Sequence, residues 1–528
     1  MIFRIVLTAL GLLCGSLAWA GNFQPDLRTL DQLPFHTLPA LSVAKSMARV
    51  QSKSQPLQFA VGVALPLGLD DGRWQPVDAD TWSWRTRIYS SGAQTLNFVF
   101  SQFHLPAGGS LWIYDAAGQV IQGPYTEAQA SADGRLWTAV IPGETAILEV
   151  RVPTASRDQV QLKLAQVNHG FRGFGKDTVA GLGLLPGGSG SCEQDVACPA
   201  GNDWPDEARS VARIAIGGVY LCSGELVNNV RQDDTPYFLT ANHCEIGQTA
   251  LTPPSSVVFY WNYQYSQCGG GLIDSLLLQN QVGSTLVAQD RASDFTLLKL
   301  NQTPSTSYKL FLSGWDAAND IPQSGAVIHH PQGDVKKISL YDSPASRQLT
   351  TLCDSTQSPC PAASMRTIGA WQVQYASGAT EPGSSGAALF NQNHQIVGLL
   401  SGGTISCSTR GTDDYDYYGR IGLAWQANAS AGGQLMASLD PDKTGALSLC
   451  GKNLGAAVCT NTIAPPTGST LLPRGSTQNL ASSGSARSSG GGGALPPISV
   501  AILALLAGLR YAMRRHRMLA REQMISAG

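Results

Sequence analysis

Residues 381–387 read Glu-Pro-Gly-Ser-Ser-Gly-Ala and lead into the apolar stretch 388–390. Two glycines flank a pair of serines, which is typical of a tight turn before a β-strand. Because glycine has no Cβ, the turn lets the amides of Gly383 and Ser385 point at one position and form an oxyanion hole. The Gly-x-Ser-Gly frame favours Ser385 as a nucleophile over Ser384. The stretch therefore predicts a reactive serine at the start of a strand in a β-rich fold.

Two earlier segments supply partners for that serine. Residues 237–244 form an apolar strand that runs into His243 beside Cys244, and residues 293–300 set Asp294 at the mouth of another apolar strand. Each signal is weak alone, since a lone His is usually structural and an Asp before a strand is often a turn residue. Together they provide what serine catalysis requires, because His243 can accept the Ser385 proton and Asp294 can orient the imidazole.

The composition agrees with a β-rich, turn-rich protein. The chain has 528 residues, with 57 Gly and 29 Pro, and 35 Lys+Arg against 37 Asp+Glu give a net charge of −2. Charged residues are 14% of the chain, below the roughly 25% of ordinary soluble proteins. Since a nucleic-acid binder shows a basic excess or stripe, we expect no nucleic-acid partner. The fold class we expect is all-β.

Both ends carry export signals. Residues 1–20 combine one Arg, a short apolar run and Ala-Trp-Ala, as in a cleavable signal peptide; a membrane anchor is the alternative. At the other end, a Ser/Gly/Pro-rich linker (460–493) precedes an apolar segment (494–512) and a basic tail (513–528). That order resembles the GlyGly-CTERM sorting signals of Gram-negative bacteria, with a plain transmembrane anchor as the alternative. We expect an exported protein, at the cell surface or secreted, with a transient or permanent C-terminal membrane anchor.

The chain between the ends changes character near residue 187. Residues 21–186 have no cysteine and contain alternating apolar stretches, for example 57–65, 95–100, 110–114 and 146–152, so a separate all-β domain is predicted there. Residues 187–459 hold ten of the 11 cysteines; Cys14 lies in the signal segment. Export favours five disulfides over a Cys/His zinc site, and there is no Cys-x-x-Cys pair. We therefore expect no metal and no cofactor.

The second region resembles a known family. From residue 187 to about 442 the sequence is similar to the bacterial lysyl endopeptidases, secreted serine proteases with a trypsin-like double β-barrel. The resemblance is carried by the segments 189–192, 198–199, 226–229, 260–264, 293–298, 314–316, 329–331 and 380–386. It implies that residues 21–186 are a propeptide removed from a zymogen on maturation. It also implies that His329 and His330 are structural, since the family has the same pair without a metal.

The resemblance extends to the cysteines. It implies the disulfides Cys192–Cys407, Cys198–Cys268 and Cys222–Cys244, the last closing the loop that bears His243. The pairs Cys353–Cys360 and Cys450–Cys459 are close in sequence, and we expect two further local bridges there.

Substrate-binding residues are also implied. The family has an Asp before x-Tyr-Gly at the base of its specificity pocket, and Asp416-Tyr417-Tyr418-Gly419 fits that pattern. A buried Asp would pair with a substrate Lys or Arg. The alternative is a solvated acidic loop made with Asp413 and Asp414. Residues Ser401, Gly402 and Gly403 should pair with the substrate backbone as an added strand.

Two departures from the family affect specificity and maturation. The family has a His where Ser401 stands, and no Trp matches the one that stacks on it, which puts strict Lys-over-Arg selectivity in doubt. The family also has a Lys before its mature Gly, whereas Pro186 precedes Gly187 here. Maturation is then expected elsewhere, for example after Lys176, or by another protease.

These observations predict an exported, monomeric serine endopeptidase that cleaves proteins or peptides after Lys, with Arg left open, and that meets export and C-terminal sorting machinery. The alternative is a surface adhesion or binding protein with a pseudo-protease barrel.

Overall fold

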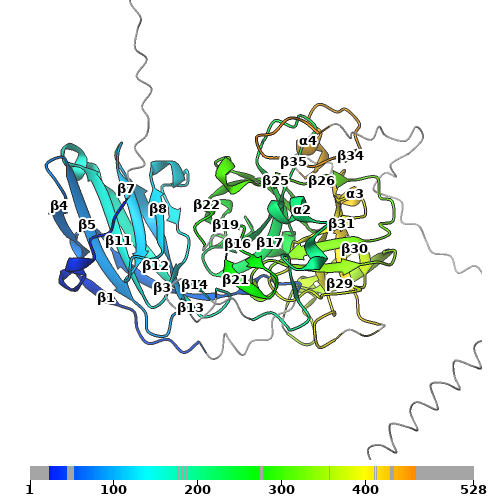
Figure 1. Ribbon diagram of the computed structural model, residues 1–528, viewed down its shortest axis with the longest axis horizontal. Coiled ribbons are helices and arrows are strands. Elements are labelled where there is room, and N and C mark those ends of the chain that lie inside the picture. Colours follow the sequence, from blue (N-terminus) through cyan, green and yellow to red (C-terminus); the bar gives the residue numbers. More distant parts are fainter. Residues whose placement is uncertain are drawn as a thin grey trace, which may run out of the picture. The chain divides into compact units, whose positions relative to one another are not determined.

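The computed structural model describes residues 23–43, 53–174, 178–179, 183–184, 188–273, 277–355, 357–409, 411, 413–427 and 433–459. Strands dominate these residues, and the few α-helices are only four to six residues long. The predicted all-β fold class is therefore confirmed. Figure 1 shows the strands of the first 170 residues in blue and cyan and the later strands in green, yellow and, for β34 and β35, orange.

The first part contains two sheets. One has six strands in the order β1-β5-β11-β7-β8, with β4 on β5; the other has five in the order β10-β6-β12-β3, with β9 on β6. Strands expected near residues 57, 95, 110 and 146 are present. The bounds are β1 Phe35–Thr37, β3 Ala60–Leu67, β4 Arg73–Pro76, β5 Thr81–Tyr89, β6 Thr95–His104, β7 Ser110–Asp115, β8 Ile121–Tyr125, β9 Leu136–Trp137, β10 Ile141–Pro142, β11 Thr145–Pro153 and β12 Gln161–Gly170.

Apolar side chains of the two sheets meet in one buried cluster. Ile113 and Val150 come from the six-stranded sheet, and Phe98 and Val167 come from the five-stranded sheet. The cluster continues into the second part through Leu221, Tyr260 and Tyr263. Burying this apolar surface in one core stabilises the contact between the two parts.

The second part begins with an eight-stranded sheet in the order β22-β19-β16-β17-β18-β24-β23. Its eighth strand, β2, comes from the first part and pairs with β17. Phe238, Phe259, Trp261 and Leu298 fill its interior. The bounds are β2 Leu57–Gln58, β16 Val211–Ile216, β17 Tyr220–Val227, β18 Tyr237–Thr240, β19 Val258–Trp261, β22 Asn280–Val282, β23 Ser284–Asp290 and β24 Phe295–Leu300.

A ten-stranded sheet follows in the order β15-β28-β27-β31-β32-β33-β30-β29, with β26 and β34 attached. Val327, Trp371, Leu389 and Tyr418 form its core. The bounds are β15 Gln194–Asp195, β26 Gly314–Asp316, β27 Gly325–His329, β28 Lys337–Tyr341, β29 Ser346–Cys353, β30 Met365–Val373, β31 Ala388–Asn391, β32 Gln395–Gly403, β33 Asp416–Arg420 and β34 Ser448–Leu449.

Short elements complete the chain. The α-helices are α2 Pro205–Ser210, α3 Ile421–Ala424 and α4 Met436–Leu439. Small two-stranded sheets pair β13 Thr178–Val179 with β14 Gly183–Leu184, β20 Tyr265–Gln267 with β21 Gly270–Ile273, and β25 Phe311–Leu312 with β35 Lys452–Asn453. The 3-10 helices are η1 Leu27–Gln32, η2 Leu69–Asp71, η3 Glu127–Gln129, η4 Thr154–Gln159, η5 Pro199–Gly201, η6 Asn242–Cys244, η7 Pro254–Ser256, η8 Thr306–Tyr308, η9 Pro331–Gly333 and η10 Ala362–Ser364.

Five disulfides join the expected cysteines. They are Cys192–Cys407, Cys198–Cys268, Cys222–Cys244, Cys353–Cys360 and Cys450–Cys459. Because Cys192 is tied to Cys407, the segment that begins the second part is held to the ten-stranded sheet region. The loop that bears His243 is likewise closed by its neighbour Cys244.

Several expectations concern residues outside those described. The signal segment 1–20, the linker 460–493, the apolar segment 494–512 and the tail 513–528 all lie there, as do Lys176, Pro186 and Gly187. Within the described ranges, no helix has the length and apolar character needed to cross a membrane. The predicted transmembrane helix, residues 494–512, falls outside the residues described.

Candidate active site

The pairing of two strands brings His243 and Asp294 together. In the antiparallel ladder of β18 with β24, Thr240 lies opposite Thr296, so the end of β18 adjoins the start of β24. His243 follows in η6, and its Nδ1 forms a 2.9 Å hydrogen bond with Asp294 Oδ2. The His243 amide also donates to Asp294 Oδ1 at 3.0 Å. The carboxylate thus fixes both the ring and the backbone of the histidine.

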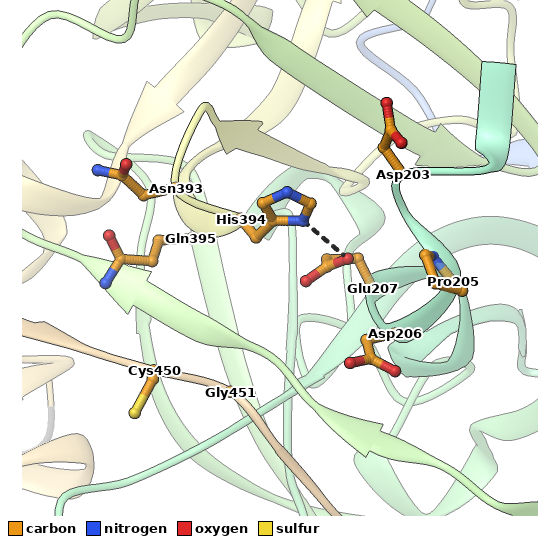
Figure 2. A pocket seen from close by; sticks show the side chains of 9 residues that line it. All are labelled: Asp203, Pro205, Asp206, Glu207, Asn393, His394, Gln395, Cys450 and Gly451. Carbon is orange, nitrogen blue, oxygen red and sulfur yellow. Dashed lines mark ion pairs between the residues drawn. The ribbon is translucent and has the colours of Figure 1, made fainter. Parts of the chain in front are cut away.

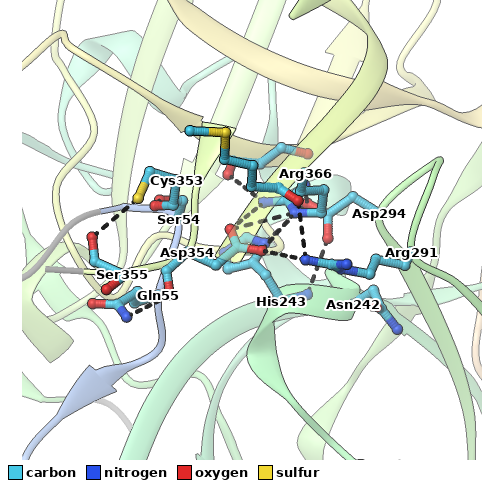
Figure 3. Close-up of polar contacts among 12 residues, drawn as sticks. Ser54, Gln55, Asn242, His243, Arg291, Asp294, Cys353, Asp354, Ser355 and Arg366 are labelled. Carbon is cyan, nitrogen blue, oxygen red and sulfur yellow. Dashed lines mark hydrogen bonds and ion pairs between the residues drawn. The ribbon is translucent and has the colours of Figure 1, made fainter. Parts of the chain in front are cut away.

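A buried arginine completes the surroundings of Asp294. Arg366 Nη1 lies 2.8 Å from Asp294 Oδ2, and both side chains are almost fully buried. Figure 3 shows Arg366 between Asp294 and Asp354, whose Oδ2 accepts from Arg366 Nε at 3.1 Å. Burial alone would raise the pKa of Asp294, but the charges of Arg366 and His243 outweigh it and hold that pKa below its usual value. Asp294 is therefore ionised at neutral pH.

The serine loop is anchored to the eight-stranded sheet. The amide of Ser223, on β17, donates to Ser385 O at 2.8 Å, and its hydroxyl donates to Gly383 O at 2.9 Å. Gly386 has a φ of +85°, and a Cβ there would lie 2.2 Å from Thr240 Oγ1. The close approach and the positive φ both require glycine at 386. Two sheets therefore meet at this loop.

The two serines have different surroundings. Ser384 Oγ forms a 2.8 Å hydrogen bond with His329 Nδ1 and accepts from the Glu381 amide, so it faces the interior. Burial lowers the pKa of His329 to about 3, which keeps that imidazole neutral. Ser385 Oγ instead donates to the carbonyl oxygen of Lys53 at 2.8 Å. This difference favours Ser385 over Ser384 as the nucleophile.

The hydrogen bond expected between Ser385 and His243 is not formed. His243 Nε2 is buried and has no hydrogen-bond partner among the described residues. The Ser385 hydroxyl points instead at the Lys53 carbonyl. The structure therefore joins His243 to Asp294 as predicted, but it holds the serine in a different hydrogen bond.

Asp416 lies at the base of a buried cation site, not in a solvated loop. Its side chain is fully buried, and its Oδ2 accepts from the Thr380 hydroxyl at 2.5 Å and the Tyr375 hydroxyl at 3.0 Å. Asp413, by contrast, is exposed. The ammonium group of Lys53 forms an ion pair with Asp416 Oδ1 and donates to Thr380 Oγ1 at 3.0 Å and to Ile405 O at 2.5 Å. The ammonium thus has three acceptors.

The predicted substrate-binding strand lies beside this site. Ser401, Gly402 and Gly403 end β32, where Gly403 pairs with Asp416 on β33. Ser401 Oγ donates to Leu399 O at 3.3 Å and accepts from the Gly419 amide at 3.2 Å. The residue that departs from the family pattern also helps to keep the pKa of Asp294 low.

Three functional neighbours were missed from the sequence. Arg366 follows the Cys353–Cys360 loop, and no local pattern announces that it reaches Asp294, 72 positions earlier. The Ile405 carbonyl carries no side-chain signal at all. Lys53 lies in the predicted propeptide, 363 residues before Asp416, and its being a lysine is the one feature of the sequence that could have linked it to that carboxylate.

Among the described residues, one cluster of potential metal ligands was found, and its chemistry does not suit a metal. Glu193, Glu381 and Cys407 lie close together, but Cys407 is in a disulfide and offers no thiolate. Burial and the neighbouring Glu381 raise the pKa of Glu193 well above its usual value, which disfavours the anionic form a metal needs. His330 Nδ1 forms a 2.9 Å hydrogen bond with Asp334 O, which is compatible with the structural role that the resemblance implies for this histidine pair.

A separate cavity lies at the start of β32, where Gln395 lines it. Glu207 and His394 form a 3.1 Å ion pair there, and Asp203, Asp206 and Asn393 also line it (Figure 2). It contains none of the predicted catalytic or substrate-binding residues. We therefore do not assign it to the reaction.

Comparisons with known proteins find similarity to lysyl endopeptidases along most of the chain. A family model described as the lysyl endopeptidase N-terminal domain matches residues 30–171, and one described as the lysyl endopeptidase C-terminal domain matches residues 186–419. A lysyl endopeptidase of Pseudomonas aeruginosa is 27% identical over 417 residues, which cover 73% of this chain and 83% of that protein.

Similar solved structures include two proteases. The active form of the Rv3671c protease from M. tuberculosis is 16% identical, covers 48% of this chain and 95% of its own, and has a TM-score of 0.30. A Glu endopeptidase in complex with MPD is 18% identical, covers 45% and 94%, and has a TM-score of 0.29. Such low scores say nothing about activity or substrate.

Proposed function

Since this chain belongs to the lysyl endopeptidase family and is a serine endopeptidase, we propose that it is exported and cleaves peptide bonds after Lys. The catalytic residues proposed are His243, Asp294 and Ser385. The single observation that carries the choice of Lys is the side chain of Lys53, which pairs with Asp416 in a buried site next to Ser385.

In the proposed reaction, Ser385 Oγ attacks the carbonyl carbon of the substrate lysine while His243 Nε2 takes the hydroxyl proton. The C–N bond then breaks, His243 returns that proton to the leaving amine, and an acyl-enzyme remains on Ser385. Water, deprotonated by His243, hydrolyses the ester and restores the hydroxyl. The hydrogen bonds from His243 to Asp294 support this role, because they fix the tautomer with Nε2 free to accept.

Negative charge that develops on the substrate oxygen needs donors. The amides of Gly383 and Ser385 are proposed for this oxyanion hole. Gly383 has a φ of +99°, and a Cβ at this position would lie 2.9 Å from His330 O. The loop conformation therefore depends on glycine here, and losing one donor of this kind costs on the order of 10²–10³ in rate.

The cation site favours Lys over Arg. An ammonium group has three N–H donors, and the site offers three acceptors, namely Asp416 Oδ1, Thr380 Oγ1 and Ile405 O. The side chain of Arg is longer than that of Lys, and its planar guanidinium needs acceptors spread along a fork. We therefore propose that Lys is the preferred residue and that Arg is cleaved more slowly.

Export, the proposed processing of residues 21–186, and C-terminal sorting complete the proposal. Domain limits of 187–459 for the working enzyme and a monomeric state belong to it as well. The five disulfides support export, because disulfides form in oxidising compartments outside the cytoplasm.

The test compares two neighbouring serines. Ser385→Ala should abolish hydrolysis of Lys-containing peptides and labelling by an active-serine phosphonate reagent. Ser384→Ala is the matched control and should keep both, with a reduced rate because the loop loses its bond to His329. The reverse pattern would overturn the assignment. Failure of the processed wild-type protein to react with the reagent would favour a binding protein with an inactive protease barrel.

A digest of a mixed peptide library then tests specificity. Cleavage after Lys in preference to Arg is expected, and equal cleavage would contradict the three-acceptor argument. A mass spectrum of the exported protein gives both of its ends. A form that retains residues 1–20 would contradict the proposed signal peptide.

A further inference from the structure

A lysine of the chain itself fills the proposed specificity pocket. The side chain of Lys53 is 6% exposed, and its ammonium meets Asp416 Oδ1, Thr380 Oγ1 and Ile405 O. This lysine belongs to the part of the chain that precedes the protease region. A substrate lysine could not enter while Lys53 is present, because one buried site holds one ammonium.

The backbone of Lys53 also engages the proposed nucleophile. The Ser385 hydroxyl donates a 2.8 Å hydrogen bond to Lys53 O, while His243 Nε2 has no hydrogen-bond partner among the described residues. The hydroxyl is thus turned from the base that should activate it. Neither the Gly383 amide nor the Ser385 amide donates to Lys53 O among the described contacts. The carbonyl is therefore bound outside the oxyanion hole.

The following residues tie this arrangement down. Lys53 and Ser54 form a turn, Ser54 Oγ donates to Cys353 O at 2.5 Å, and Gln55 Nε2 donates to Asp354 O at 2.8 Å. Figure 3 shows Ser54 and Gln55 beside Cys353 and Asp354, near His243. Strand β2 then pairs with β17. A protease substrate binds as an extended strand, so a turn at Lys53 opposes cleavage.

We propose that residues 53–58, here called the Lys53 segment, act as an internal inhibitor that keeps the unprocessed chain inactive. The segment fills the lysine pocket with Lys53 and holds the Ser385 hydroxyl in a bond to the Lys53 carbonyl. This inference rests on the proposed function, because it takes the Asp416 site as the substrate pocket. It adds that the inhibitor is a lysine of this chain, bound in a form that is not cleaved.

Tethering makes such an inhibitor effective. A segment joined to the same chain competes at an effective concentration in the millimolar range, so ordinary substrate concentrations do not displace it. The segment is continuous with β3 of the first part. It therefore leaves the pocket only when that part separates from the protease region.

The experiment measures pocket occupancy without catalysis. Full-length Ser385→Ala protein, which cannot process itself, is titrated with dansylcadaverine, a fluorescent probe that ends, like lysine, in a primary ammonium on a flexible alkyl chain. Lys53→Ala in the same background is expected to bind the probe at least roughly tenfold more tightly, because the tethered competitor is gone. Lys163→Ala is the matched control, since Lys163 is exposed on β12, and it should bind as weakly as the parent.

Each outcome decides the matter. Equal binding by the parent and the Lys53→Ala protein overturns the internal inhibitor. Processed wild-type enzyme is titrated in parallel; if it binds the probe and the Lys53→Ala protein does not, the Lys53 segment is not what closes the pocket. If neither binds, the site is no cation pocket, and the proposed function fails with it. If the melting temperature shows that Lys53→Ala does not fold, Lys53→Met takes its place, because it removes the charge and keeps a long unbranched side chain. Weak binding of the probe by that variant counts against the internal inhibitor.

Discussion

Replacing Asp416 with Asn tests the chemistry of the pocket most directly. The change removes the charge of a fully buried carboxylate and keeps its shape. A lysine ammonium then retains two neutral acceptors, Thr380 Oγ1 and Ile405 O, and loses the only anionic one. Breaking a buried ion pair at one partner costs about 3–5 kcal/mol. At about 1.4 kcal/mol for each factor of ten, kcat/KM for a Lys substrate should fall roughly 10²- to 10⁴-fold.

The assay is kcat/KM of processed enzyme on matched peptides with Lys or Met at the cleaved position. The Met peptide should lose far less than the Lys peptide, since a thioether has no charge to pair. Asp413→Asn is the control, because Asp413 is an exposed carboxylate three residues before Asp416, which begins β33. A fall of less than about tenfold for Lys, or equal losses for both peptides, would refute the buried-pair reasoning.

Three further changes probe the site and its support. Arg366→Met should raise the pKa of Asp294, because the charge of that arginine offsets the effect of burial. A carboxyl group whose pKa is lowered in the folded protein contributes stability that is lost as pH falls through that pKa. The acid limb of the kcat/KM profile should therefore move to higher pH, and an unmoved limb would contradict this reasoning. Gly386→Ala should abolish activity, because its Cβ would clash with Thr240, and a crystal structure or activity assay showing a tolerated Ala refutes it. Removing the Cys222–Cys244 disulfide, with its separation of 22 residues, should lower the free energy of unfolding by about 3 kcal/mol in urea titrations, and an unchanged midpoint counts against it.

Local sequence patterns were enough to predict several strands and to single out His243 and Asp294 as partners. Alternation around residues 95 and 146 predicted β6 and β11, and the apolar stretches before His243 and after Asp294 became β18 and β24. The antiparallel register of those two strands then brings the side chains together. Cysteine pairing was predicted by the family resemblance and, for the two short loops, by closeness in sequence.

The contacts that Arg366 and Lys53 make with the candidate site could not be predicted in this way. Arg366 lies on β30, which pairs with β33 and β29 of the ten-stranded sheet, whereas Asp294 precedes β24 of the eight-stranded sheet, so their contact depends on the arrangement of both sheets. The role of Lys53 depends on a contact between the two parts of the chain. A lysine in a predicted propeptide has many uses, and no spacing marks this one.

The contact between Ser223 and the serine loop has a consequence for how the enzyme loses activity. His243 and Asp294 belong to the eight-stranded sheet, whereas Ser385 precedes a strand of the ten-stranded sheet, and Ser223 bonds across the seam to Ser385 O and Gly383 O. Glu225 crosses the same seam to the amide of Ala388. Catalysis by the proposed triad would thus depend on the alignment of two halves that each have their own core. A small slip along the seam would silence the enzyme while both halves keep their strands, so heat or denaturant should extinguish turnover before the β-sheet signal fades.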